Sequence, residues 1–295
     1  MAPSPTASAL LRDDLATSQA GREFEFTDDD FRFLAKCAYD FAGISLSDSK
    51  VNLVYGRLSR RLRALKLPDF KSYRDYLTKN EREIENFINS ISTNHTKFFR
   101  ESHHFDHLHA NVTAPFGHQR GAATGRRMRI WSAGCSSGEE PYTIASVLAR
   151  DISDIKRQDV LILATDIDTE ILGRAARGEY QPAALEEIPA PYKPYFSLET
   201  RAGREAMVVA DELRDIVRFK RLNLMQDWPI KGLFDAIFCR NVMIYFDAPT
   251  KARLIDRFIA QLKPDGWLYI GHSESLTGGH PGLKLMGRTI YRKTG

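Results

Sequence analysis

The sequence has few cysteines and no long apolar run, and these absences exclude several classes of protein. Its three cysteines, Cys37, Cys135 and Cys239, are far apart and form no C-x-x-C pair, which argues against a disulfide framework and a zinc ribbon. A small, odd number of cysteines is typical of a protein in a reducing compartment. The longest near-continuous apolar run, Val160–Ala164, is far shorter than the roughly 20 residues that span a bilayer. We therefore expect no metal site and no membrane insertion.

The amino-terminal end and the overall charge also lack a strong signal. The first twenty residues carry Asp13 and Asp14 after a short apolar patch, and they lack the basic and apolar regions of a signal peptide. Lys plus Arg number 42 and Asp plus Glu 38, so the net charge is +4. That value is too small to indicate a nucleic-acid-binding protein by itself. We expect a cytoplasmic protein that is a monomer.

The length and composition are those of a globular chain with about two domains. The chain has 295 residues, 43% of them hydrophobic and 27% charged, and a typical domain has roughly 150 residues. Residues 1–22 are rich in Ala, Ser, Thr and Pro, which predicts a disordered tail. Residues 23–110 show helical spacing and predict an N-terminal helical domain. Residues 111–127 contain Pro and several Gly and predict a linker.

Four helices are expected in the helical domain. Thr27 precedes three aspartates, as an N-cap precedes an acidic first turn. Gly43 is expected to end this first helix. Further helices are expected near Ser49–Leu65, Phe70–Lys79 and Glu81–Ser90.

Residues 128–295 change to apolar strands that alternate with helices. Such alternation indicates an α/β fold with a doubly wound sheet. Expected strands are Met128–Ser132, Val160–Thr165, Ile216–Phe219, Phe234–Cys239 and Trp267–Gly271. Residues 182–214 interrupt the alternation and, with the strand-like Ala206–Ala210, predict a small inserted β-subdomain.

The segment after the first expected strand, Ser132–Pro141, has small residues followed by a helix that begins with Glu139 and Glu140. Small residues permit close approach of a ligand to the backbone, and a helix N-terminus offers free N–H groups. Two carboxylates there would repel a pyrophosphate but suit the α-amino group of an amino acid. The segment therefore favours S-adenosylmethionine (SAM) over NAD, although the glutamates also complement the helix dipole.

Polar residues follow two more expected strands. Asp166 ends one strand, where an acidic residue can bind both ribose hydroxyls, while Asp168 is better explained as the N-cap of the next helix. Arg240 and Asn241 end a buried strand, and Tyr245 follows shortly after. Ligands of open α/β sheets bind beyond the carboxyl ends of strands, so we expect these groups to line one site.

These segments, together with Asn94, Thr96 and Arg100 in the sequence Thr93–Glu101, resemble the CheR family of chemoreceptor glutamate methyltransferases. The matching stretches are Thr93–Glu101, Ser136–Tyr142, Asp166–Thr169, Asn223–Leu224, Cys239–Phe246 and Gly271–Glu274. The resemblance covers about residues 26–291. It implies a class I SAM-methyltransferase domain over 128–295, with a small antiparallel β insertion, behind a small all-α domain.

The resemblance also implies the site residues. SAM contacts are expected at Asn94, Thr96, Arg100, Glu140, Asp166, Asn223, Leu224, Arg240 and Asn241. Glu139 and Glu140 are adjacent, and alignment with the family motif favours Glu140. Arg100 and Tyr245 are expected nearest the transferred methyl group, as catalytic residues. The implied reaction transfers a methyl group from SAM to a receptor glutamate, and it leaves a γ-methyl ester and S-adenosylhomocysteine. A carboxylate is ionised near pH 7, since its reference pKa is about 4.3, and needs no general base.

The helix over residues 50–66 carries six basic residues and no acidic one. A solvated face is the ordinary explanation, but a face of one sign attracts an acidic surface. The family resemblance assigns this helix to docking on the glutamate-rich methylation helices of chemoreceptors. Arg57, Arg60, Arg61 and Arg63 are the expected receptor-binding residues, and Arg57 and Arg63 are the first candidates.

Other functions are weighed against this one. An RNA or DNA methyltransferase would keep the SAM site, but the strand-end sequence Cys239–Val242 differs from the Asp/Asn-Pro-Pro-Tyr/Phe motif of amino-methylating DNA enzymes. A noncatalytic SAM-binding regulator is a second alternative. A metal site at His103, His104, His107 and His109 lacks a further ligand at a diagnostic spacing, so interdomain or surface histidines are favoured. Some family members grip a receptor pentapeptide with the inserted subdomain, and the sequence leaves its use here open.

Overall fold

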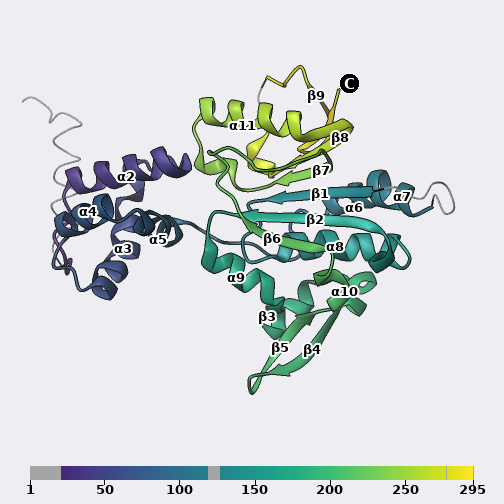
Figure 1. The fold of residues 1–295 in the computed structure, drawn as a ribbon, viewed down its shortest axis with the longest axis horizontal. Helices are drawn as coiled ribbons and strands as arrows, with labels where there is room; N and C mark the ends of the chain where they lie inside the picture. Colours follow the sequence, from purple (N-terminus) through teal and green to yellow (C-terminus); the bar gives the residue numbers. More distant parts are fainter. Residues whose placement is uncertain (1–20, 119–126, 277, 295) are drawn as a thin grey trace, which may run out of the picture. The chain divides into compact units, whose positions relative to one another are not determined.

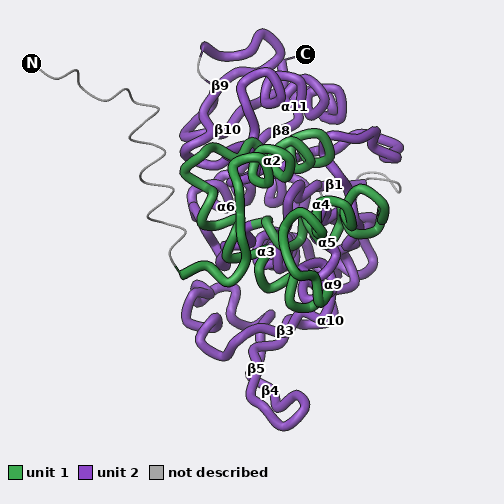
Figure 2. The backbone as a smooth tube through the Cα atoms, turned by 90° about the vertical axis from the view of Figure 1, so that its left-hand side faces the viewer, with its two compact units in different colours: residues 1–92 green, residues 93–295 purple. Residues whose placement is uncertain are grey.

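A computed structural model describes residues 21–118, 127–276 and 278–294 of the chain. Its residues divide into two compact units, 1–92 and 93–295 (Figure 2). The predicted disordered tail over residues 1–22 falls outside the described residues except for its last two positions. None of the described helices combines the length and the hydropathy needed to cross a lipid bilayer.

The smaller unit is a helical bundle, as the periodicity predicts. It contains α2 (Asp28–Ala42), the 3₁₀ turn η1 (Asp48–Lys50), α3 (Val51–Leu65), α4 (Phe70–Lys79) and α5 (Glu81–Ile91). Helix α3 packs on α5, and α2 packs on α4 and α5. The apolar stripes of these helices meet in a core that includes the buried side chains of Leu34, Leu58, Leu62, Phe70 and Phe87.

The ends of α2 confirm the predicted caps. The Thr27 side chain accepts the N–H of Asp30 at 3.1 Å, and the Asp30 carboxylate accepts the N–H of Thr27 at 3.0 Å. This reciprocal capping box satisfies donors that the first helical turn leaves unpaired. Gly43 ends the helix with a φ of 70°, the left-handed conformation that glycine adopts without strain.

The larger unit is built on a twisted seven-stranded sheet with the order β6-β2-β1-β7-β8-β10-β9 (Figure 1). The strands are β1 (Arg127–Ala133), β2 (Asp159–Asp166), β6 (Val217–Arg221), β7 (Phe234–Cys239), β8 (Leu262–Ile270), β9 (Leu283–Gly287) and β10 (Ile290–Lys293). Neighbouring strands from β6 to β8 are parallel, while β10 is antiparallel to both β8 and β9. Since β1 lies between β2 and β7, the chain reverses its winding there, and the predicted doubly wound α/β fold is confirmed.

Helices cover both faces of this sheet (Figure 1). One core joins alternate residues of β1 and β7 to α6 (His103–Leu108), α8 (Glu139–Asp151) and α9 (Thr169–Arg177). The other core joins the remaining residues of these strands to α11 (Ala248–Gln261). Ile130 and Phe238 belong to the first core and Trp131 and Ile237 to the second, as the two-residue period of a strand requires.

The predicted boundary and linker are wrong in part. The smaller unit ends at Ser92 rather than at residue 110. Residues 103–118 are helical, in α6, the π-helical turn η2 (His109–Thr113) and α7 (Ala114–His118), and belong to the larger unit. The reason is packing, because Phe105, Leu108 and Val112 are buried in the core that contains β1 and α8. The rest of the predicted linker, 119–126, lies outside the described residues.

The insertion is a three-stranded antiparallel sheet with the order β3-β5-β4. Its strands are β3 (Glu179–Tyr180), β4 (Phe196–Arg201) and β5 (Arg204–Val209), joined by the 3₁₀ turns η4 (Pro182–Glu187) and η5 (Ala190–Tyr195) and followed by α10 (Asp211–Arg214). Ala202 and Gly203 both have positive φ in the hairpin turn, as the tight turns of β-hairpins require. The predicted antiparallel insertion is confirmed, and it begins slightly earlier than expected.

Candidate functional site

The loops that follow five parallel strands carry the polar residues expected to form the site. The loop after β1 contacts β2 through its backbone, with the N–H of Gly134 donating to the Thr165 carbonyl at 2.7 Å. We call this edge of the sheet the strand-end site. It contains the loops 134–138, 166–168, 222–225, 240–245 and 271–274, which follow β1, β2, β6, β7 and β8.

The loop between β1 and α8 is shaped by close packing. Gly134 and Gly138 have φ values of 85° and 97°. A Cβ on Gly134 would lie 2.3 Å from the Val242 side chain, and one on Gly138 would lie 2.8 Å from the Tyr180 hydroxyl. From the sequence, the small residues were expected to permit close approach of a ligand. The structure shows that neighbouring protein atoms already leave no room for a side chain at either glycine.

Two aspartates stand at the end of β2, and the structure separates their roles. The Asp166 carboxylate is buried and accepts the N–H groups of Ser136 at 2.8 Å and Asp168 at 3.0 Å. Burial raises the pKa of Asp166, and these backbone donors oppose the shift. The Asp168 side chain accepts two N–H groups at the start of α9, which confirms it as the N-cap. Asn94 donates to Asp168 at 2.8 Å, so the structure brings this predicted residue to the end of β2.

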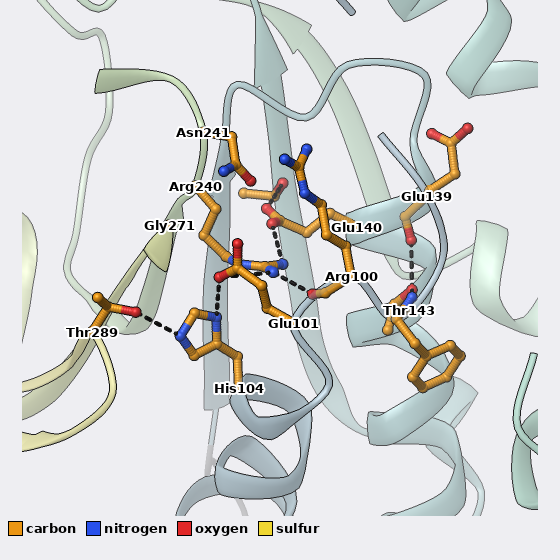
Figure 3. Close-up of polar contacts among 12 residues, drawn as sticks. Arg100, Glu101, His104, Glu139, Glu140, Thr143, Arg240, Asn241, Gly271 and Thr289 are labelled. Atoms are coloured by element: carbon orange, nitrogen blue, oxygen red, sulfur yellow. Dashed lines mark hydrogen bonds and ion pairs between the residues drawn. The ribbon is translucent and has the colours of Figure 1, made fainter. Parts of the chain in front are cut away.

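A buried group of charges lies where β1 and β7 end (Figure 3). The Arg240 guanidinium, only 2% exposed, donates to the Glu140 carboxylate at 3.0 Å and lies 3.5 Å from the carboxylate of Glu101. It also donates to the backbone carbonyl of Arg100. Glu140 accepts a further hydrogen bond from Ser132 at 2.7 Å. We call Arg240, Glu101, Glu140 and the Arg100 carbonyl the Arg240 cluster.

The two adjacent glutamates of α8 point in different directions (Figure 3). Glu140 faces Arg240, whereas the Glu139 carboxylate points away and accepts hydrogen bonds from Ser137 at 2.7 and 2.9 Å. Burial raises the pKa of both, and Arg240 opposes the shift at Glu140 only. The geometry therefore places Glu140, and not Glu139, beside the other strand-end residues.

Arg100 lies on a turn with an unusual backbone. The residues on either side of it, Phe99 and Glu101, have φ values of 50° and 57°. Non-glycine residues in this left-handed region cost free energy and persist only where the surroundings enforce them. Arg240 holds the carbonyl of this turn, and His272 contacts Glu101 at 3.1 Å. These contacts fix the turn that presents the Arg100 side chain, whose guanidinium donates to the His95 carbonyl at 2.9 Å.

The remaining predicted residues also lie at the strand-end site or in the segment that leads to Arg100. Asn223 and Leu224 are buried directly after β6, and the Asn223 side chain accepts the N–H of Met225 at 2.9 Å. The half-buried Tyr245 has its hydroxyl 3.4 Å from the Thr93 carbonyl. Thr96 is half-buried. Asn241 has a φ of 60° and stands next to Arg240 in the close-up (Figure 3).

The sequence did not predict that His104 is a buried residue of the larger unit. This side chain is fully buried in the larger unit, and its Nε2 lies 3.1 Å from the Thr289 hydroxyl. Burial, with the nearby Arg240 charge, lowers the pKa of His104 to about 3, so the imidazole is neutral at pH 7. The expectation of an interdomain or surface histidine is wrong here. No group of three metal-binding side chains occurs among residues 21–118, 127–276 and 278–294.

The arginines of α3 are less free than the sequence suggests. Arg61 donates to the buried Glu83 at 2.7 and 2.5 Å, and Arg63 pairs with Glu23 at 2.9 Å. Arg57 donates to the carbonyls of Ile91 and Ser92. Arg60 is exposed and forms no ion pair with the described part of the chain. A pocket of about 290 Å³ is lined by Arg57, Arg60, Arg61, Ala64 and Ser90.

Replacing Glu83 with Gln is expected to destabilise the smaller unit by roughly 3 kcal/mol at neutral pH, because it breaks a largely buried ion pair. Burial alone would raise the pKa of Glu83, but hydrogen bonds from Arg61 and Asn86 outweigh it and hold the pKa below 4.5. The stabilisation is therefore present above pH 4.5 and is lost as the pH falls through the lowered pKa. Unfolding followed by circular dichroism at a series of pH values from 7 downward checks this.

The tryptophans provide the control for that measurement. Trp131, Trp228 and Trp267 all belong to the larger unit, so the Glu83→Gln change should leave the transition seen by tryptophan fluorescence in place. A difference between variant and wild type that stays equal down the whole pH series would show that the charge of Glu83 is not the cause.

Comparison with known proteins agrees with the two units. A family model for the SAM binding domain of CheR methyltransferases matches residues 94–291, and a model for their all-alpha domain matches residues 29–92. The chain belongs to the CheR methyltransferase family. The two matched regions meet at the unit boundary between Ser92 and Thr93, and the resemblance seen in the motifs is confirmed.

Curated relatives match nearly the whole chain. Chemotaxis protein methyltransferase 2 of Pseudomonas aeruginosa is 44% identical over 274 residues, which cover 92% of this chain and 95% of that relative. A probable chemotaxis protein methyltransferase of Rhizobium etli is 43% identical over 260 residues, 87% and 96% of the two chains. The chemotaxis protein methyltransferase of Escherichia coli is 40% identical over 277 residues, 92% and 93% of the two chains.

The strand-end site fits the SAM that this CheR domain uses. The hydroxyl of Ser136 is buried in the β1–α8 loop and has no hydrogen-bond partner among the described residues. Among the described residues, the Asp166 carboxylate is bonded only to backbone N–H groups, and a carboxylate can accept about four hydrogen bonds. Spare acceptors beside a helix start that carries Glu139 and Glu140 suit the ribose and α-amino groups of SAM better than a pyrophosphate.

Proposed function

We propose that this methyltransferase transfers a methyl group from SAM to glutamate side chains of chemoreceptors, yielding γ-glutamyl methyl esters and S-adenosylhomocysteine. Membership of the CheR family supports methyl transfer, and the names of the relatives support a role in chemotaxis. The observation that carries the proposal is the convergence of Arg100, Glu140 and Arg240 at one strand-end site (Figure 3). Tyr245 lies in the same loop as Arg240, after β7.

The cofactor is proposed to lie across the ends of β1, β2, β6 and β7. Glu140 and Asp166 are placed toward its amino acid and ribose parts. The remaining contacts are assigned to Asn94, Thr96, Arg100, Asn223, Leu224, Arg240 and Asn241. Because two nitrogens of the Arg240 guanidinium already bind Glu140 and the Arg100 carbonyl, Arg240 also orients Glu140 and the Arg100 turn.

The proposed reaction requires little proton transfer by the protein. SAM, when bound, supplies a methyl group that is activated by a positive sulfur. A substrate carboxylate is already ionised near pH 7, because its reference pKa is about 4.3, so no residue here has to act as a base. The chain contributes by holding the substrate carboxylate in line and by excluding water. Arg100 and Tyr245 are the residues proposed to orient the reacting groups.

The smaller unit is proposed to dock the receptor through α3. The pocket beside α3 has three arginines in its wall, and arginine binds carboxylates with a planar fork of donors. Of the four arginines predicted for docking, Arg57, Arg61 and Arg63 also make contacts inside the unit. Arg60 therefore becomes the first candidate for contact with an acidic receptor helix.

Replacing Arg60 with Glu is expected to lower kcat/KM for receptor methylation about tenfold, because like charges face each other in the encounter. The affinity for S-adenosylhomocysteine should stay at the wild-type value, since Arg60 is in the other unit. Steady-state methylation of receptor-bearing membranes and calorimetry of cofactor binding check the two expectations.

Arg82→Glu is the matched control for Arg60→Glu. Arg82 is exposed on α5, forms no ion pair with the described residues and does not line the pocket, yet the variant makes the same change in charge. Equal losses in both variants would mean that overall charge, and not the α3 pocket, governs docking.

The proposal as a whole is tested by transfer of a labelled methyl group to receptors as an ester that base cleaves to methanol. A stable methyl amine on nucleic acid, or binding of SAM without transfer, would favour the alternative functions instead.

A further inference from the structure

The loop after β8 contains a buried carboxylate that joins two strand ends. Glu274 ends the 3₁₀ turn η7 (His272–Glu274) and is 7% exposed. One of its carboxylate oxygens accepts the N–H of Gly271 at 2.7 Å and that of Asn241 at 2.8 Å. The other accepts the N–H of Ile244 at 3.0 Å. Glu274 thus connects its own loop to the loop after β7.

The fit around this carboxylate is tight. A Cβ on Gly271 would lie 2.7 Å from the Glu274 carboxylate and 2.8 Å from the Asn241 side chain, so only glycine fits there. No basic side chain pairs with Glu274 within residues 21–118, 127–276 and 278–294. Burial raises the pKa of Glu274, and the backbone donors oppose the shift. The carboxylate is therefore held by N–H groups of the very segment that it contacts.

That segment carries two residues of the proposed site. Asn241 has a φ of 60°, a conformation that a residue other than glycine keeps only when its surroundings hold it. Ile244 belongs to the 3₁₀ turn η6 (Met243–Tyr245), which ends at Tyr245. Two residues before Glu274, His272 contacts Glu101 next to Arg100 at 3.1 Å. The turn after β8 thus contacts the supports of both proposed catalytic residues.

We infer that Glu274 is a positioning residue, whose carboxylate fixes the backbone of residues 241–245 and so aims Asn241 at the cofactor and Tyr245 at the reacting groups. The roles of Asn241 and Tyr245 in this inference rest on the proposed function. Glu274 touches neither cofactor nor substrate in this account, and it acts through the loop that it holds.

The test compares Glu274→Gln, Tyr245→Phe and the double variant with wild type. An amide in place of the carboxylate presents an N–H to backbone N–H groups, so at least one of the three hydrogen bonds is lost. Hydrogen exchange should become faster in a peptide covering residues 240–246. Turnover should fall roughly tenfold in Glu274→Gln. The turnover of the double variant should be within about twofold of that of the slower single variant, because the two residues act as a unit.

Asp235→Asn is the matched control. Asp235 also accepts a backbone N–H, from Arg129 at 2.8 Å, and in addition it pairs with Lys263 at 2.7 Å. It lies near the opposite end of β7. This variant should speed exchange near residue 129, leave residues 240–246 unchanged and keep turnover at the wild-type value. If Glu274→Gln is too unstable to purify, Glu274→Asp keeps the charge on a shorter side chain and enters the same comparison.

The inference is overturned if exchange over residues 240–246 is unchanged in the Glu274 variant, or if the two losses of turnover multiply in the double variant. A failure of the proposed function is a separate result. If the wild-type protein methylates no receptor glutamate, that function is lost, while the exchange measurement still decides whether Glu274 holds residues 240–246.

Discussion

Replacing Arg240 with Met is expected to destabilise the larger unit by about 3–5 kcal/mol, because removing one partner from a buried ion pair leaves an uncompensated charge. Arg240 is 2% exposed, and its partners Glu140 and Glu101 are each 12% exposed. The variant leaves both carboxylates without their cation and releases the Arg100 carbonyl. We expect binding of S-adenosylhomocysteine to be lost as well, because Glu140 and Arg100 lose their support.

Urea unfolding followed by tryptophan fluorescence measures the first effect, since all three tryptophans are in the larger unit. Adding Glu140→Gln to the variant removes one unpaired charge and should restore part of the stability without restoring cofactor binding. A loss below 1 kcal/mol in Arg240→Met, with normal cofactor affinity, would show that the Arg240 cluster supports neither the fold nor the site.

Replacing Tyr245 with Phe is expected to lower turnover roughly ten- to a hundredfold while the affinity for SAM changes by less than about threefold. A residue that acts mainly in the transition state affects kcat more than ground-state binding. The change removes only the hydroxyl, which lies 3.4 Å from the Thr93 carbonyl and is too far for a strong hydrogen bond. The hydroxyl is therefore available to a reacting group.

Tyr195→Phe is the matched control for Tyr245→Phe. Tyr195 is also half-buried in the larger unit, but it lies in the insertion, and the same atom is removed. Single-turnover methylation, with cofactor affinity measured separately, distinguishes the two effects. Unchanged turnover in Tyr245→Phe, or a parallel fall in turnover and affinity, would contradict a catalytic role.

The fold was predictable where a short stretch of sequence contains its own signals. Thr27 caps α2 with its side chain and Gly43 with its left-handed backbone, and both act within one turn of the helix end. The strand Phe234–Cys239 was predicted at its observed bounds because all its residues except Asp235 are apolar and polar residues follow it. Local signals fail where packing assigns a residue its role. Gly117 looks like a linker residue, yet a Cβ there would lie 2.1 Å from the Asp151 carbonyl, so this glycine permits α7 to approach α8.

The candidate site was predictable as a set of strand ends, but its internal pairing was not. Motif order placed Glu140, Asp166 and Arg240 at one edge of the sheet, and the structure shows that arrangement. The ion pair between Arg240 and Glu140 joins residues 100 positions apart, and it depends on the sheet order, which no local pattern contains. The same limit applies to α3, where Glu83 and Glu23 neutralise two arginines that the sequence presents as a single basic face.

Methylation of chemoreceptor glutamate carboxylates by this protein is tested most directly by one measurement. The protein is incubated with methyl-labelled SAM and membranes that contain the receptors, and the washed membranes are then treated with base. We expect labelled methanol from the receptor band, in amounts that fall in Arg60→Glu and Tyr245→Phe and stay normal in Arg82→Glu. No base-released methanol with any receptor, from a protein that binds SAM, would contradict it.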